Sequence, residues 1–323
     1  MKRFMCMRYT FLTISIALFL LIVGTAPILA EEAKPAAAAP ASAATAPTPA
    51  VAPAPAVAEE EKPTADFSVS ALTKYVWRGY EQTRDGIVVQ PSLTVGYKGF
   101  SANLWGNLDT RPYSAAPGIS YPSTWTETDF TLSYSKTFGP VTAGVGYIYY
   151  GLAAPNKDAL SPLPAQELFV SVALNKLLTP TLTVYDEIDH YHNWYFLLGV
   201  SHTIEFNKVI SLKLAASVSY LLSTYADANQ FNVNSTYGGY PKFDDQYQAT
   251  NDKFSNFHDG LVSISLPITP AKYITITPTI SYTFPLSNDA KNEIKARGIQ
   301  GTSTPGDRDS SFLYGGLVFD IAF

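Results

Sequence analysis

The chain has 323 residues, of which 46% are hydrophobic, 13% aromatic and only 15% charged, with a formal net charge of −5 at pH 7. Soluble domains carry about 25% charged residues, so this balance suits a protein whose surface meets lipid, and the negative charge disfavours nucleic-acid binding. After Ala30 no segment reaches the roughly 18 uninterrupted apolar residues of a membrane-spanning helix, which excludes a multi-spanning helical protein.

The amino-terminal segment predicts export from the cytoplasm. Basic residues precede an apolar run from Phe11 to Val23, and a small residue, Ala30, stands before an acidic segment. This order is typical of a secretory signal peptide, here residues 1–30, and the alternative is an uncleaved inner-membrane anchor. The only cysteine, Cys6, precedes the apolar run, so lipidation is not expected and the mature chain has no disulfide.

Residues 31–65 predict a disordered linker on the periplasmic side. Alanine and proline dominate this segment, and its ends are acidic. Proline-rich chains favour the extended polyproline II conformation and bury no core. At about 3.1 Å per residue the linker reaches on the order of 100 Å. It is expected to act as a spacer, or alternatively as an arm that contacts the cell wall.

The rest of the chain, residues 66–323, alternates between apolar and polar residues with period two, which is the pattern of β-strands. About twelve such segments are predicted, most of them near the ten residues that a tilted strand needs to cross a bilayer. In chain order they are Phe67–Trp77, Val88–Tyr97, Phe100–Asp109, Thr126–Lys136, Val141–Tyr150, Glu167–Asn175, Thr181–Ile188, Trp194–Thr203, Val209–Leu221, Gly260–Leu266, Tyr273–Phe284 and Leu313–Phe323.

The connections between these segments are alternately tight and long. Outer-membrane barrels have short periplasmic turns, longer extracellular loops and an even number of strands, so the alternation favours that architecture with periplasmic amino and carboxy termini. The tight connections lie near residues 98–99, 139–140, 176–180, 206–208 and 269–272, and the long ones near 110–123, 151–165, 223–258 and 285–310.

The final strand carries the clearest signal. Its outward face is almost entirely apolar, whereas the other face carries small residues and one acid, Asp320. Outer-membrane barrels resemble this pattern, and in them the last strand is the element that the insertion machinery reads. The residues expected to form this carboxy-terminal insertion signal are Phe319, Ile321 and Phe323.

The fold class predicted is therefore all-β: a transmembrane, antiparallel, up-and-down β-barrel. Aromatic residues near strand ends, among them Tyr75, Trp77 and Trp194, are expected to form the interfacial girdles. A soluble two-sheet sandwich is the alternative, because facing sheets can use the same alternation. The signal peptide, the loop asymmetry and the aromatic final residue favour the barrel.

Several segments together resemble the TorF-type porin family. They are Lys74–Gln82, Gln90, Trp105–Asn107, Glu127–Phe130, Gly146–Tyr150, Thr179–Tyr185 and Gly199–His202. The resemblance covers roughly residues 66–220 and implies an outer-membrane barrel that forms a channel, without specifying its solute.

Polar and charged residues on the inward-facing positions are the candidate pore-lining residues. In a narrow barrel, such charges either set a constriction that selects solutes or pair with one another to stiffen the interior, and both readings stay open. A lumen rich in serine and threonine predicts no strong ion selectivity. The candidates are Lys74, Arg78, Asn103, Trp105, Glu127, Asp129, Glu167, Tyr185, Glu187 and Lys213.

Metal binding and catalysis are weaker readings. The segment Asp186–His192 holds carboxylates and two histidines, but spacing fixes no third ligand, so neither a metal nor a cofactor is expected. The acids Asp244, Asp245 and Asp252 lack the regular spacing of a calcium loop. No histidine lies in a defensible nucleophile motif, so an enzyme is not expected.

The function predicted from sequence is passive diffusion of small hydrophilic solutes through a porin-like channel in the bacterial outer membrane. The expected partners are outer-membrane lipid, the barrel-insertion machinery and the solutes. The alternatives are a structural barrel with a closed lumen that binds a partner through its loops or linker, and, less favoured, an outer-membrane hydrolase.

Overall fold

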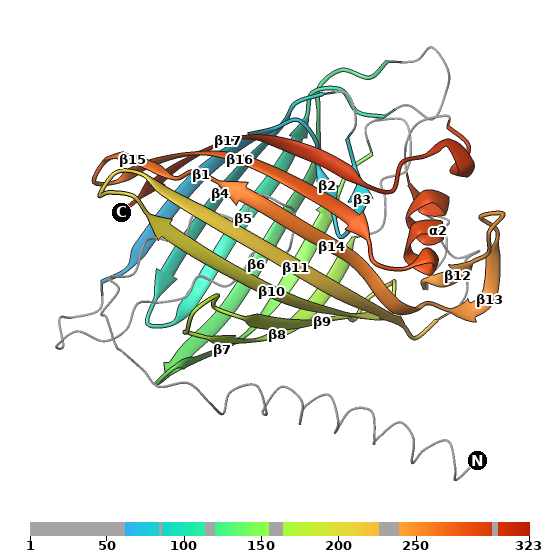
Figure 1. The fold of residues 1–323 in the computed structure, drawn as a ribbon, viewed down its shortest axis with the longest axis horizontal. Helices are drawn as coiled ribbons and strands as arrows, with labels where there is room; N and C mark the ends of the chain where they lie inside the picture. Colours follow the sequence, from blue (N-terminus) through green and yellow to red (C-terminus); the bar gives the residue numbers. More distant parts are fainter. Residues whose placement is uncertain (1–61, 84–85, 114–119, 155–163, 226–238, 299–302) are drawn as a thin grey trace, which may run out of the picture. The chain divides into compact units, whose positions relative to one another are not determined.

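A ring of antiparallel strands dominates the computed structural model, which describes residues 62–83, 86–113, 120–154, 164–225, 239–298 and 303–323 (Figure 1). Each long strand pairs with the next, and pairing of β14 with β16 and of β1 with β17 closes the ring at twelve strands. The strands are β1 (Thr64–Leu72), β4 (Val88–Tyr97), β5 (Phe100–Asp109), β6 (Thr124–Phe138), β7 (Val141–Leu152), β8 (Ala165–Leu174), β9 (Thr181–Glu187), β10 (Asn193–Glu205), β11 (Ser211–Ser223), β14 (Ser255–Ser265), β16 (Ile274–Pro285) and β17 (Phe312–Ala322).

Smaller elements accompany the ring. The strand β15 continues β14 beyond Pro267 and pairs with β16. In Figure 1 the helix α2 and the hairpin β12–β13 lie beyond one end of the long strands, and β15 lies at the other. The bounds are β2 (Val76–Trp77), β3 (Tyr80–Glu81), β12 (Pro241–Phe243), β13 (Ala249–Lys253), β15 (Ile268–Ala271), α2 (Asn288–Arg297) and the short 3₁₀ helix η2 (Pro305–Asp307).

The predicted closed, antiparallel, twelve-stranded barrel is confirmed. The signal peptide and most of the linker lie outside the described residues, and the first strand begins at Thr64, two residues before the expected boundary. Between the strands of the ring lie further elements that the sequence did not predict, among them the hairpins β2–β3 and β12–β13 and the helix α2. Among the described residues, no helix is long and apolar enough to cross a membrane.

The two faces of the strands have opposite chemistry. On β17, Leu313 and Leu317 are 61% and 53% exposed, whereas Tyr314 and Val318, each the next residue along the strand, are 3% and 1% exposed. The same alternation continues around the ring, with leucine, valine, isoleucine and phenylalanine on the outer face. In hydrocarbon every backbone polar group must pair within the protein, and a closed barrel with an apolar outer face meets that requirement.

The tight turns of the sequence lie where they were predicted. Lys98 and Gly99 link β4 to β5, with φ of 51° and 84°, the left-handed conformation that a two-residue hairpin turn requires. Gly139 and Pro140 link β6 to β7, and of these two residues only Gly139 has a positive φ, of 58°. Because consecutive strands alternate in direction, all these turns lie at one end of the barrel and the long loops lie at the other.

The first predicted strand was wrong beyond its midpoint. It was expected to run to Trp77, with Tyr75 and Trp77 facing lipid, but β1 ends at Leu72. Tyr75 is instead 4% exposed and packs inside the barrel, and Trp77 packs against the interior cluster. Alternation continues past Leu72 in the sequence, so period two alone could not reveal that the chain leaves the wall there.

The seam between the first and last strands tolerates no side chain at Gly316. This residue pairs with Leu72, and a Cβ added to it would collide with the carbonyl oxygen of Ala71. The variant Gly316→Ala is therefore expected to refold into lipid vesicles with a clearly lower yield than wild type, measured by circular dichroism. Gly199→Ala is the matched control, because a Cβ there meets its nearest neighbour only at 3.9 Å. Equal yields for both variants would contradict the tight seam.

Candidate functional site: a plug at one end of the barrel

A short hairpin turns from the wall into the barrel. Arg78 and Gly79, with φ of 45° and 84°, make a two-residue turn that joins β2 to β3. Positive φ is costly for a residue other than glycine and is found where the surroundings over-determine the conformation. Lys74 holds the base of the hairpin through an ion pair of 2.6 Å with Glu81.

Hydrogen bonds also hold both ends of the hairpin to the wall. The Tyr75 hydroxyl donates to Glu127 Oε2 at 2.8 Å, and the Thr83 hydroxyl donates to the Asp109 carboxylate. Asp109 and Glu127 belong to the neighbouring wall strands β5 and β6. The hairpin is therefore tethered to the inner face of the wall on both sides of its turn.

Arg78 is the most heavily contacted residue of the hairpin. Its two terminal nitrogens donate to the two carboxylate oxygens of Glu167 at 2.7 Å each, and the side chains are only 5% and 2% exposed. The guanidinium also lies over three aromatic rings, 4.7 Å from Trp77, 4.8 Å from Tyr185 and 4.2 Å from Tyr195. A bidentate, charge-assisted pair reinforced by stacking fixes the hairpin against strands β8, β9 and β10.

The helix α2 covers the hairpin tip. Ser287 caps it by accepting a hydrogen bond from the backbone of Ala290, and Ala290 and Ile294 bury their side chains in the interior cluster. A Cβ built on Gly79 would lie 3.0 Å from Ile294 Cδ1 and 3.2 Å from Asp259 Cβ. We call the hairpin Val76–Glu81 together with the helix Asn288–Arg297 the plug.

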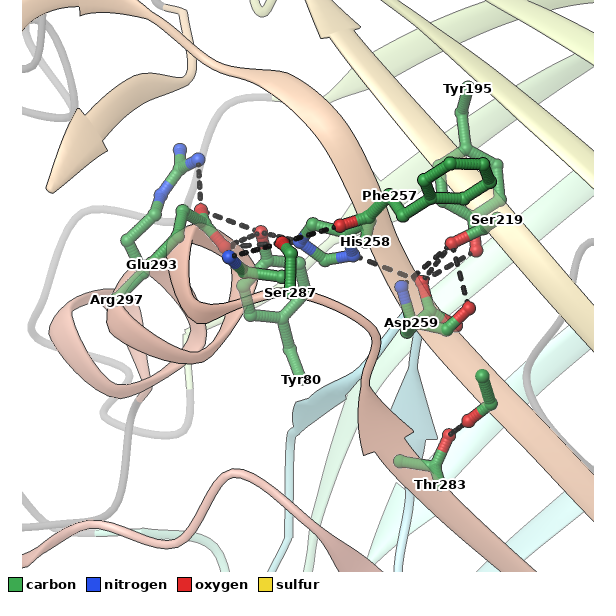
Figure 2. Close-up of polar contacts among 12 residues, drawn as sticks. Tyr80, Tyr195, Ser219, Phe257, His258, Asp259, Thr283, Ser287, Glu293 and Arg297 are labelled. Atoms are coloured by element: carbon green, nitrogen blue, oxygen red, sulfur yellow. Dashed lines mark hydrogen bonds and ion pairs between the residues drawn. The ribbon is translucent and has the colours of Figure 1, made fainter.

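A buried carboxylate joins the parts of the plug (Figure 2). Glu293 of α2 accepts from the Tyr80 hydroxyl at 2.6 and 2.7 Å, lies 3.1 Å from His258 Nε2 and accepts from Arg297 at 2.9 Å. Burial alone would raise the pKa of Glu293, but Arg297, His258 and Tyr80 together hold it below the ordinary glutamate value. The carboxylate is therefore ionised at neutral pH, and its charge is satisfied by groups from the hairpin, the helix and the wall.

The same network reaches the barrel wall through a second carboxylate. Asp259, next to His258 on β14, lies 3.0 Å from His258 Nδ1. It accepts from the Ser219 hydroxyl at 2.7 Å and from the Tyr195 hydroxyl at 2.8 Å, as Figure 2 shows. Because Tyr195 also stacks on Arg78, one continuous set of contacts links both halves of the plug to strands β10, β11 and β14.

Serine, histidine and aspartate meet in this network, but not in the arrangement of a hydrolase. The hydroxyl of Ser219 is held by Asp259, and among the hydrogen bonds of the described residues it makes none to His258. Ser219 and His258 are also 1% exposed. A catalytic serine must contact its base and reach a substrate, and this serine does neither.

Most of the predicted pore-lining residues come together around the plug. Arg78 pairs with Glu167 beside Tyr185, Lys74 holds Glu81, and the ring of Trp105 lies 5.6 Å from that of Tyr75, which binds Glu127. The inward-facing side chain of Asp129 lies within electrostatic reach of Glu127 and Glu167.

Three of the predicted residues lie apart from this group. Asn103 donates to the hydroxyls of Ser92 and Thr94 at 2.8 Å on the neighbouring strand. Lys213, on β11, lies opposite Thr203 and Ser265 in the register of the two neighbouring strands. Glu187 ends β9 and accepts four backbone amides of residues 189–192 at 2.6 to 3.2 Å, so it organises a turn.

The metal hypothesis for Asp186–His192 gains no support from the geometry. Within the described ranges, no three His, Cys, Asp or Glu residues lie together as a metal site requires. The backbone amides of this segment are taken up by Glu187, which explains its acidic character as turn stabilisation. In the other acidic segment, Asp244 likewise accepts the amides of Gln246 and Gln248 at 2.9 and 2.8 Å.

The sequence missed Tyr80, His258, Asp259 and Glu293. His258 was assigned to a loop, although β14 begins at Ser255, and Glu293 lies in a segment treated as a loop because of its length. The serine cap and the basic end of α2 were usable helix signals. Nothing local to the sequence pairs Tyr80 with a glutamate 213 residues away.

No family model and no curated protein sequence matches the chain. Solved structures with a related shape include a NanC porin, with 11% identity, 80% of this chain and 98% of that chain covered, and a TM-score of 0.41. They also include OmpF of Salmonella typhi, with 8% identity, coverage of 81% and 98%, and a TM-score of 0.32. OmpT, an outer membrane protein of Vibrio cholerae, has 7% identity, coverage of 81% and 97%, and a TM-score of 0.34.

These scores are low, so the assignment rests on the molecule itself. The ring is closed, its strand number is even, and its outer face carries an apolar belt. The chain is a β-barrel of the outer-membrane type. The barrel wall is thus the membrane-spanning part, with the hairpin of the plug inside it and the helix of the plug at one end.

Proposed function

We propose that this protein is an outer-membrane channel for small hydrophilic solutes whose described conformation is closed by the plug. The observation that carries the proposal is the inward hairpin with its buried Arg78–Glu167 pair. Twelve strands enclose more space than an eight-stranded barrel, which side chains alone can fill, and here a separate hairpin and helix fill one end. A plug that is added to a barrel, rather than built from its wall, is an element that can move.

The polar inward face of the barrel supports the same function. Serine and threonine recur on the inward face of the strands, among them Ser68, Thr142, Ser171, Thr183 and Thr277. Such side chains suit passage of hydrophilic solutes.

We place the protein in the TorF-type porin group on the segments quoted above, with both termini periplasmic and with Phe319, Ile321 and Phe323 as the insertion signal. A linker contact with the cell wall belongs to the same proposal.

Single-channel recording in planar bilayers tests the channel. The wild-type protein is expected to show brief, infrequent conductance steps, because the plug must shift before solutes pass. A folded protein that never conducts above an empty bilayer, in wild type and in a variant with a loosened plug, would contradict the channel. That result would favour the structural barrel with a closed lumen, to which the tightly packed plug also points.

A further inference from the structure

Within the described part of the chain, one pair of carboxyl groups inside the barrel has no basic residue as a partner. Glu127 and Asp129 lie on β6 and both face inward. Alternate residues on one strand face lie about 6.6 Å apart, close enough for the two charges to interact. Among the described residues, neither takes part in an ion pair, whereas Glu81 and Glu167 nearby are neutralised by Lys74 and Arg78. The inner wall therefore holds, beside the plug, two carboxyl groups that no basic residue of the described part of the chain neutralises.

Two buried oxygen atoms at this point lack a protein partner. Asp129 Oδ1 and Thr131 Oγ1 are shut off from solvent, and neither has a hydrogen-bond partner among the described residues. Thr131 is only 5% exposed and follows Asp129 by two positions on the same face of β6. Native proteins satisfy nearly all buried polar atoms, so unmatched oxygen atoms beside two carboxyl groups that lack a basic partner indicate a ligand that offers positive charge.

The surrounding groups suit a small cation rather than a multidentate metal. Trp105 and Tyr150 flank Asp129 on the two neighbouring strands, and aromatic ring faces attract cations. The described residues hold no cluster of three metal-ligating side chains, so a tightly held divalent metal does not fit. The site offers two carboxylates, one hydroxyl and aromatic rings. This combination favours weak, reversible binding of a monovalent cation.

We infer that Glu127, Asp129 and Thr131 form a lumen subsite for small monovalent cations, which makes the channel cation-selective. This inference rests on the proposed channel and goes beyond the sequence reading, which predicted no strong ion selectivity. Conduction requires a site that attracts an ion without trapping it, and a partly satisfied carboxylate pair meets that requirement.

Two measurements test the subsite, one of which does not need conduction. The first is the melting temperature of the protein in detergent in potassium chloride against N-methylglucamine chloride at equal ionic strength. Potassium that binds the native state raises this temperature. The second is the permeability ratio of potassium to chloride, from the reversal potential in a potassium chloride gradient.

Asp129→Asn is expected to abolish the potassium-dependent rise in melting temperature and to lower the permeability ratio by roughly fivefold or more, since one lumen charge is lost. Thr131→Val, which keeps the shape of the side chain, is expected to weaken both effects. Glu205→Gln is the matched control, because it removes the same charge from an exposed position at the end of β10. Circular dichroism confirms that each variant is folded.

The outcomes separate the subsite from the channel. Potassium stabilisation that Asp129→Asn removes, in a protein that never conducts, supports the subsite and contradicts the channel. Conduction without cation preference, or a preference unchanged in Asp129→Asn, overturns the subsite alone. A melting temperature independent of potassium also overturns it, and indicates a proton shared between the two carboxyl groups.

Discussion

Replacing Arg78 with methionine is expected to lower the free energy of unfolding by about 3–5 kcal/mol, the usual cost of leaving one partner of a buried ion pair uncompensated. Methionine keeps much of the length of the arginine stem but removes both hydrogen bonds to Glu167 and the contacts over three rings. Urea unfolding in lipid vesicles, followed by the fluorescence of the four tryptophans, of which Trp77 and Trp105 pack beside the hairpin, measures the loss. The same variant is expected to open the channel more often than wild type.

Two controls separate the charge from the packing. Arg111→Met removes an arginine from an exposed position and is expected to change the stability little. The double variant Arg78→Met with Glu167→Gln removes both charges, so it is expected to recover part of the lost stability. A double variant as unstable as the sum of the single variants would contradict a direct coupling between these two residues.

The membrane itself made most of the barrel predictable. Lipid requires large apolar residues at every second position of each strand. In β4, β5 and β16 the sequence follows this alternation almost without exception. Their predicted bounds agree with the structure to within one residue at each end. The turns were visible for a similar reason, because residues such as Gly99 and Gly139 adopt a positive φ that few other residues tolerate.

The interior was harder because its partners are distant in sequence. Arg78 and Glu167 are 89 residues apart, and Tyr80 and Glu293 are 213 apart, so no local pattern joins them. Tyr75 and Trp77 look like interfacial aromatics, since aromatic residues serve both in lipid girdles and in buried cores. The pore-lining candidates were found only because polar residues that alternate with lipid-facing ones must face inward. This rule gives the face of the strand on which each residue lies, but not its interaction partner.

Replacing Glu293 with alanine is expected to release α2 from the hairpin. The carboxylate is the common partner of Tyr80, His258 and Arg297, so its loss removes the carboxylate that pairs with Arg297 and one of the two carboxylates that contact His258. The expected results are faster hydrogen exchange of the α2 amides, a loss of stability of about 3–5 kcal/mol, and a higher open probability in planar bilayers.

Lys291→Ala is the matched control for this helix, because Lys291 is exposed on the opposite side of α2 from the buried Glu293. It is expected to leave exchange, stability and open probability near their wild-type values. Glu293→Gln keeps an acceptor for Tyr80 but loses the charge, so an intermediate effect is expected.

Faster hydrogen exchange of the α2 amides in Glu293→Ala, without any conductance in planar bilayers, would mean that Glu293 holds the helix but that the helix does not close a channel. Unchanged exchange would mean that the buried carboxylate is not what holds the helix, and that the packing of Ala290 and Ile294 suffices.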